Sequence, residues 1–140
     1  MRVDAFLCDA ATIREGLLHV LGGGVTRIWR ERYPAELLCM LASMISMDPS
    51  EGDRPHSISV LVTAQDGEQI VRIEGQFRGT PGPGRIPGEA LHIPQVIDMH
   101  QVAIPAPGVY SVSILINGSS YSQLTFRAAL KSERPPPGDR

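Results

Sequence analysis

The stretch over residues 105–126 constrains the fold of this chain more than any other. Apolar side chains recur there at every second position, at Tyr110, Val112, Ile114 and Ile116. This is the period of a β-strand with one buried face and one hydrated face. Asn117-Gly118 follows and predicts a tight turn, because both residues adopt positive φ at low cost. The apolar spacing then resumes at Leu124 and Phe126, so the stretch predicts a β-hairpin.

Short β-like segments continue along the rest of the chain. Residues 57–64 alternate between polar and apolar, and Asp66-Gly67 supplies a hairpin signal before residues 69–77. Residues 37–47 fit either a helical face or a strand buried on both sides, and we favour a strand because the neighbouring segments are all β. We therefore predict an all-β fold, an antiparallel Ig-like β-sandwich of about seven to nine strands, as a single domain over residues 1–130.

The backbone outside the strands supports three further predictions. Residues 78–89 contain three Pro and four Gly, which predicts a flexible loop. Residues 131–140 are charged and rich in Pro, which predicts a disordered tail. The Pro-Ala-Pro-Gly-Val-Tyr run that ends at Tyr110 predicts a tyrosine corner, in which the phenol hydrogen-bonds to the backbone just upstream.

Charge and hydropathy exclude two classes of partner. The 140 residues carry a net charge of −2 with both signs interspersed, whereas nucleic-acid binders present a basic face or a high pI. No apolar run approaches the ~18 residues of a membrane span. Asp4 and Asp9 interrupt the apolar run that a signal peptide would need. We therefore expect a cytoplasmic protein without nucleic-acid or membrane partners, in which Cys8 and Cys39 are buried, reduced thiols.

Residue types that carry catalysis or bind metals show no familiar spacing here. The chain lacks a Gly-x-Ser-x-Gly elbow, and strand-like sequence follows the contiguous glycines at 22–24, unlike the helix of a phosphate loop. The histidines lack the short pairs typical of zinc sites; they are His19, His56, His92 and His100. We therefore predict no catalytic residue, no metal, no cofactor and no enzymatic activity. One alternative stays open, a small-ligand-binding or metal-dependent sandwich with a pocket near residues 78–100, where His92, Asp98 and His100 would converge.

The densest cluster of arginine and aromatic side chains is the candidate interaction surface. It consists of Trp29, Arg30, Arg32 and Tyr33, next to Arg27. These residue types are enriched at binding hot spots, although the cluster also fits a solvated strand end with the indole packed on arginine stems. We expect these four residues to contact an unidentified protein partner or a second copy of the chain.

Three pieces of the chain together resemble a known family. They are FLCDAATI at residues 6–13, GLLHVLGGGVTRIW at 16–29 and PAPGVYSVSILINGSSYSQLTFRA at 105–128. Their order and spacing are similar to those of a bacterial family of small β-sandwich proteins, a domain of unknown function, over most of residues 3–128. The chain departs from that pattern with Leu17 where a lysine is common and with three glycines where one is usual. The resemblance implies the sandwich fold and no catalytic residue. The function is therefore predicted as unknown, with a non-enzymatic protein-interaction or structural module favoured.

Overall fold

The fold is all-β. The computed structural model describes residues 1–79 and 84–137, and its regular elements there are strands and two short 3-10 turns. The strands are β1 (Arg2–Cys8), β2 (Ala10–Arg14), β3 (Leu17–Leu21), β4 (Arg27–Arg30), β5 (Ala35–Glu36), β6 (Met40–Met47), β7 (His56–Ala64), β8 (Gln69–Phe77), β9 (Leu91–Asp98), β10 (Ala103–Ile104), β11 (Gly108–Ile116) and β12 (Ser119–Leu130). The turns are η1 (Pro49–Glu51) and η2 (Lys131–Glu133).

The described residues form twelve strands, more than the seven to nine predicted. One reason is Asp9, which divides residues 3–13 between β1 and β2, although their apolar residues predict a single strand there. The Asp9 backbone N–H donates to the carbonyl oxygens of Leu21 and Gly22, at 3.1 and 3.3 Å, so the chain leaves β1 and enters a separate hairpin, β2–β3. The other reason is the pair β5–β10, whose two-residue strands are too short to show any periodicity.

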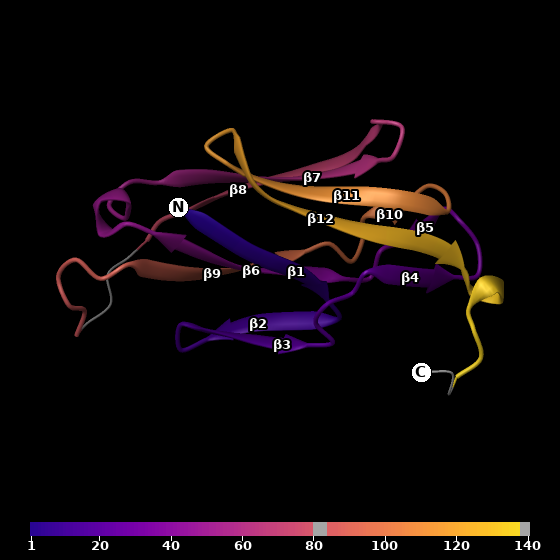
Figure 1. Cartoon of the computed structure of the whole chain (residues 1–140), viewed down its shortest axis with the longest axis horizontal. Helices are drawn as coiled ribbons and strands as arrows, with labels where there is room; N and C mark the ends of the chain where they lie inside the picture. The colour runs from indigo at the N-terminus through magenta and orange to yellow at the C-terminus, as the bar shows by residue number, and fades with distance from the viewer. Residues whose placement is uncertain (80–83, 138–140) are drawn as a thin grey trace.

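Two larger sheets form the body of the molecule (Figure 1). One has the strand order β4-β12-β11-β7-β8, and its β4–β12 pair is parallel. The other has the order β1-β6-β9 and is antiparallel throughout. Figure 1 shows β7, β8, β11 and β12 of the five-stranded sheet above the three-stranded sheet, with the β2–β3 hairpin below. The hairpin therefore lies on the face of the three-stranded sheet that points away from the five-stranded sheet.

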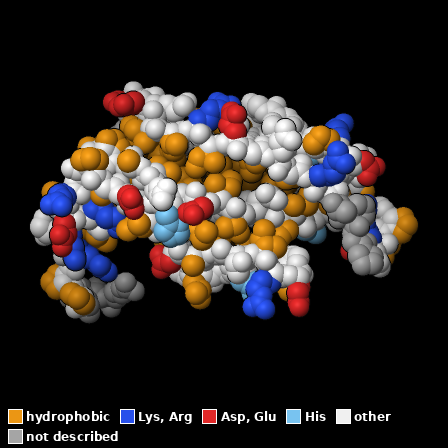
Figure 2. Space-filling model, turned by 180° about the vertical axis from the view of Figure 1, so that it is seen from behind, with side chains coloured by type: hydrophobic (Ala, Val, Ile, Leu, Met, Phe, Trp, Pro, Cys, Tyr) orange, Lys and Arg blue, Asp and Glu red, His pale blue; other side chains and the backbone are white. Residues whose placement is uncertain are grey.

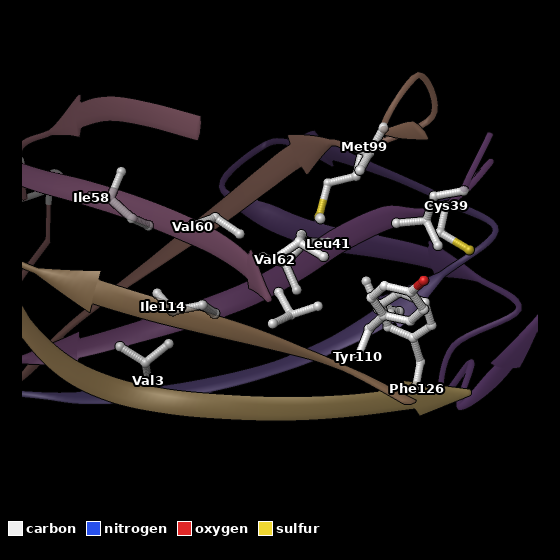
Figure 3. Packing of buried hydrophobic residues seen from close by; sticks show 14 of the residues in the cluster. Val3, Cys39, Leu41, Ile58, Val60, Val62, Met99, Tyr110, Ile114 and Phe126 are labelled. Carbon is white, nitrogen blue, oxygen red and sulfur yellow. The ribbon is translucent and has the colours of Figure 1, made fainter. Parts of the chain in front are cut away.

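The core lies between the two larger sheets (Figure 3). Alternate side chains of both sheets enter it, including Val3, Leu7, Leu41, Ile45, Val60, Val62, Val112, Ile114 and Phe126. Each fully buried aliphatic side chain contributes about 1.5–3 kcal/mol relative to its exposure to water, so this cluster is the main source of stability. The strand predicted within residues 37–47 is confirmed as β6. It turns Leu41 into the core, and Ala42 on its other face is also fully buried.

The β11–β12 hairpin is confirmed in its pairing and in its turn. Tyr110 pairs with Phe126, and Asn117 and Gly118 adopt φ angles of 52° and 85°. The tyrosine corner is present as well, because the Tyr110 hydroxyl donates a hydrogen bond to the Ala106 carbonyl oxygen and the side chain is buried.

The segments predicted to be flexible are described in part. Within residues 78–89, residues 80–83 lie outside the described chain, so flexibility there stays a prediction. Within residues 131–140, η2 continues the chain directly from β12, and the Arg134 N–H donates to the Lys131 carbonyl oxygen at 3.1 Å. Residues 138–140 again lie outside the described chain, so the disorder predicted there is untested.

The two larger sheets meet along one side and stay apart along the other. β1 and β12 approach each other on the first side. The second side holds the edge strands β8 and β9, whose half-buried Val71, Ile73, Ile93 and Ile97 pack on the core. Figure 2, seen from behind, shows hydrophobic side chains gathered in a band across the middle of the molecule. The core is therefore partly open to solvent along this side.

Candidate functional site

β4 carries the centre of the predicted interaction surface. It is an edge strand of the five-stranded sheet, where Trp29 pairs with Ala129 in parallel register. Alternation turns Ile28 into the core and leaves the indole of Trp29 half-buried. The guanidinium of Arg27 lies over that indole, 5.6 Å from the ring centroid, which is a cation–π distance. The indole is therefore packed on an arginine at the surface of the strand.

Arg30 is a structural link rather than a free surface cation. Its guanidinium donates to three backbone carbonyl oxygens, those of Trp29 at 2.8 Å, Glu36 at 2.9 Å and Leu37 at 2.5 Å. Carbonyl oxygens at a strand edge otherwise need water or another donor. Arg30 therefore attaches β4 to the segment that leads into β6 and holds its own charge in place.

Tyr33 and Arg32 have opposite roles. The Tyr33 hydroxyl donates to the carbonyl oxygen of Ala129 on β12 at 2.8 Å, and burial, as the largest effect, raises the pKa of this phenol. Tyr33 is therefore a neutral donor turned toward the protein. Arg32 is exposed, and within the described chain its side chain forms no hydrogen bond or ion pair. Of the four predicted residues, Tyr33 therefore contacts the fold and Arg32 faces solvent, and the role of all four in association is untested.

A hollow of about 330 Å³ lies beside β4. Trp29 and Arg30 line it together with Asp9, Leu38 and Arg134, which come from distant parts of the chain. Sequence reasoning missed these last three residues, because no local pattern brings a β1–β2 corner, the entry to β6 and the chain after η2 together. Part of the predicted surface, Trp29 and Arg30, is therefore concave.

The two cysteines are buried and unpaired with each other. Cys39 lines the hollow, and burial, the largest effect, raises its pKa to about 11. Burial and the neighbouring Asp9 also raise the pKa of Cys8. Because the thiolate is the reactive form of cysteine, neither side chain has the character of a nucleophile at neutral pH.

The alternative site near residues 78–100 does not assemble around its predicted side chains. His92 and Asp98 lie at opposite ends of β9, about 20 Å apart at the rise of an extended strand. His92 contacts Ser46 Oγ at 3.0 Å. His100 contacts the Asp98 carboxylate through its ring at 2.7 Å and through its backbone N–H at 2.9 Å, and these hydrogen bonds lower the pKa of Asp98. The convergence that the alternative site would need therefore does not occur, because Asp98 and His100 meet but His92 lies at the other end of β9.

The buried His56 is fully engaged in the fold. Its Nε2 lies 2.7 Å from the Glu51 carbonyl oxygen, and its Nδ1 lies 2.9 Å from Nδ2 of Asn117. The ring also stacks on Phe77, with 5.4 Å between centroids. These partners assign a neutral ring with its proton on Nε2, because Nδ1 must accept from the amide. His56 therefore joins η1 to the β11–β12 turn.

The β2–β3 hairpin exposes large apolar side chains. Leu17 and Leu21 are 63% and 73% exposed, and they share one face of β3 with His19. A mainly apolar hollow of about 480 Å³, lined also by Thr12 and His19, follows the hairpin surface. Two-stranded hairpins are marginally stable alone, and this one contacts β6 and β9 mainly through β2. In Figure 1, β3 is the strand farthest from the body of the molecule.

β3 also differs from the other edge strands in its composition. Edges normally carry charged residues or proline, which discourage pairing with another chain. β1, β2, β4, β8 and β9 each contain at least one such residue. β3 has the sequence LLHVL and, in the described chain, pairs with β2 alone. Among the described edge strands longer than two residues, β3 is therefore the one without a charged residue or a proline.

Metal-ligand clusters and membrane-spanning helices are absent from the described residues. No group of three or more His, Cys, Asp or Glu side chains is placed to hold a metal ion. No helix there has the length and hydropathy needed to cross a membrane.

Comparison with known proteins identifies one family. Residues 3–129 match the model of a family of unknown function, DUF6941. No curated protein and no solved structure matches the chain. The family match covers almost all of the strands described above and assigns no activity to any residue.

Proposed function

The chain belongs to the DUF6941 family, whose function is unknown, and from this premise we propose that it is a non-enzymatic interaction module that pairs with a second copy of itself through β3. One observation carries the proposal: β3 is an unprotected edge that holds Leu17 and Leu21 in solvent. Exposed apolar edges are the parts of a sheet most prone to pair with another chain.

The order of residues in β3 favours a second copy as the occupant. An antiparallel strand pair centred on His19 places Leu17 opposite Leu21 of the other copy, and Leu18 opposite Val20. This arrangement is two-fold symmetric, so the same residues meet on both sides, as a closed dimer requires. It would create a four-stranded sheet, β2-β3 of one copy beside β3-β2 of the other. Opposed apolar pairs each contribute about 0.2–1 kcal/mol, in addition to the burial of the leucines.

A sedimentation experiment tests the proposal. The wild-type chain should show a mass that rises from one copy to two as its concentration increases. Leu21→Glu should remain a monomer, because the two-fold axis places each new carboxylate in an apolar contact. Ile86→Glu is the matched control, since Ile86 is similarly exposed, at 67% against 73% for Leu21, but lies outside the hairpin. A wild-type mass of one copy at all concentrations would contradict the proposal.

A charge exchange tests the register. In the proposed pairing, the double variant Leu17→Lys/Leu21→Glu forms two Lys–Glu contacts across the axis and should dimerise again. Leu17→Glu/Leu21→Glu should stay monomeric, because it places like charges opposite each other. If both double variants dimerise, or if neither does, this register is wrong. The sedimentation of the wild-type chain then shows whether it associates in another way.

We also infer the type of architecture and the cellular location, each from a separate observation. The architecture is of the Ig-like sandwich type, which the tyrosine corner and the core between two sheets support. The location is cytoplasmic, which the free thiols of Cys8 and Cys39 support, because thiols persist in reducing compartments. Circular dichroism with a solved structure, and fractionation of the source cells, test these two statements.

A further inference from the structure

We propose that the hollow beside β4 binds a carboxylate group of an acidic, extended segment of a partner protein. The proposal concerns a different surface from β3 and does not depend on self-association. Three arginines, Arg27, Arg30 and Arg134, line this hollow.

Charge complementarity identifies the kind of partner. Three arginines and one aspartate line the hollow, a net charge of +2, whereas the whole chain has a net charge of −2. None of the three arginines forms an ion pair with a described residue. A concave surface with a net positive charge attracts negative charge, so the hollow favours an anionic group.

The geometry of the arginines favours a carboxylate. Arg27 is held over the indole of Trp29, which leaves the N–H edge of its planar guanidinium available. A guanidinium presents paired N–H donors that match the two oxygens of a carboxylate. Arg30 already donates to three carbonyl oxygens, which fix its guanidinium in place, so its main contribution is a fixed positive charge. Arg27 and Arg134 are therefore the donors that the ligand would contact.

The rim of the hollow favours a peptide over a small inorganic anion. Leu38 lines the hollow, is 48% exposed and has a φ of 57°. This conformation is unfavourable for a leucine, and such residues persist where the surrounding structure holds them. The backbone N–H of Leu38 donates to the His100 carbonyl oxygen at 3.1 Å, which holds it there. Leu38 and Trp29 offer apolar contacts that a side chain next to the carboxylate would fill.

Trp29 is the single tryptophan of the chain, so its fluorescence reports directly on the hollow. The probe is a capped hexapeptide of alternating glutamate and leucine, titrated at low ionic strength. It should cause a saturable change in Trp29 emission, and its glutamine counterpart should bind at least tenfold more weakly. Added salt should weaken binding of the glutamate peptide, because screening reduces the attraction between exposed charges.

Variants locate the binding. Arg27→Gln and Arg134→Gln should each weaken binding of the glutamate peptide at least tenfold. Arg54→Gln is the matched control, because Arg54 is also exposed and without an ion pair in the described chain, but lies in the loop between η1 and β7. Equal loss in Arg54→Gln would show a nonspecific charge effect and overturn the proposal. Thermal unfolding of each variant confirms that the fold is kept.

Competing anions and the β3 variant Leu21→Glu complete the test. The carboxylate assignment would be overturned if inorganic phosphate or single-stranded oligothymidine displaced the peptide at equal concentration. It would also be overturned if the glutamate peptide left the emission of Trp29 unchanged. Leu21→Glu should bind the peptide as tightly as the wild type. Retained binding in that variant separates this hollow from the β3 edge, and lost binding would overturn the claim that the two surfaces are independent.

Discussion

The hydroxyl of Tyr110 lies 2.6 Å from the carbonyl oxygen of Ala106, to which it donates a hydrogen bond. The same hydroxyl accepts from the Ala106 N–H at 3.3 Å. The ring stacks on Phe126 with 5.4 Å between centroids, so the polar end and the apolar body of one side chain are both satisfied in the interior. This contact fixes the chain where it enters β11, the strand at the centre of the five-stranded sheet.

Removing this hydroxyl should weaken the fold without changing it. Tyr110→Phe keeps the ring on Phe126 but leaves the Ala106 carbonyl without its donor. A lost buried hydrogen bond of this kind costs about 1–3 kcal/mol, so the free energy of unfolding should fall by that amount in urea denaturation. Tyr121→Phe is the control, because Tyr121 is 41% exposed, and it should change stability by less than about 0.5 kcal/mol. Equal effects of the two substitutions would show that the corner contributes nothing.

Arg30 should be intolerant of lysine although the charge is retained. Lysine presents a single ammonium group and does not reproduce the fork that reaches the carbonyl oxygens of Trp29, Glu36 and Leu37. Arg30→Lys should therefore lower the free energy of unfolding by about 1.5–3 kcal/mol. Arg32→Lys, at an exposed position without such contacts, should be neutral within about 0.5 kcal/mol. A neutral Arg30→Lys would show that β4 is attached by other contacts.

The stability of the protein should decrease in alkaline solution because of Cys39. Burial raises the pKa of this thiol from 9.0 to about 11, so the unfolded chain loses the proton first. The contribution to stability is full below pH 9 and is lost as pH rises through about 11. A shift of this size corresponds to a loss of roughly 2–3 kcal/mol in the free energy of unfolding. Urea denaturation between pH 8 and pH 11 measures it.

The control for this pH dependence is Cys39→Ala. It should lower stability at pH 8 because it leaves a small cavity, but its further decline up to pH 11 should be shallower than that of the wild type. Some decline should remain, since the pKa values of Cys8 and Tyr33 are also raised by burial. Parallel curves for wild type and Cys39→Ala would contradict the assignment.

Patterns that act over a few residues were the reliable part of the sequence analysis. The period of two in residues 110–116 and the positive φ preference of Asn117-Gly118 both act locally, and both appear as predicted in β11 and its turn. The choice of strand for residues 37–47 was also correct, because a run apolar on both faces suits a strand covered by the core on one side and by a hairpin on the other. The predicted number of strands was too low partly because the hydrogen bonds of the Asp9 backbone N–H separate β1 from β2.

The sequence predicts some residues of the candidate site but not others. Residue type predicts Trp29 and Arg30 as site residues, and both line the hollow. Residue type predicts Tyr33 equally, yet its hydroxyl donates to the backbone of Ala129. Arg134 lies in a segment predicted to be disordered, and nothing in its neighbourhood signals a site. Residue type alone therefore does not distinguish a side chain that contacts a partner from one that binds its own backbone.

The amino-acid sequence by itself determined that this chain forms paired strands with a buried face, because alternation and turn chemistry are properties of neighbouring residues. Tertiary structure alone decided which edges and which arginines remain available. The free edge of β3 depends on how the β2–β3 hairpin packs on the three-stranded sheet, and the hollow depends on residues 9, 38 and 134 meeting beside β4. The physical reason is that burial of apolar surface brings distant segments together, and no local pattern of residues records which charges and edges that burial leaves exposed.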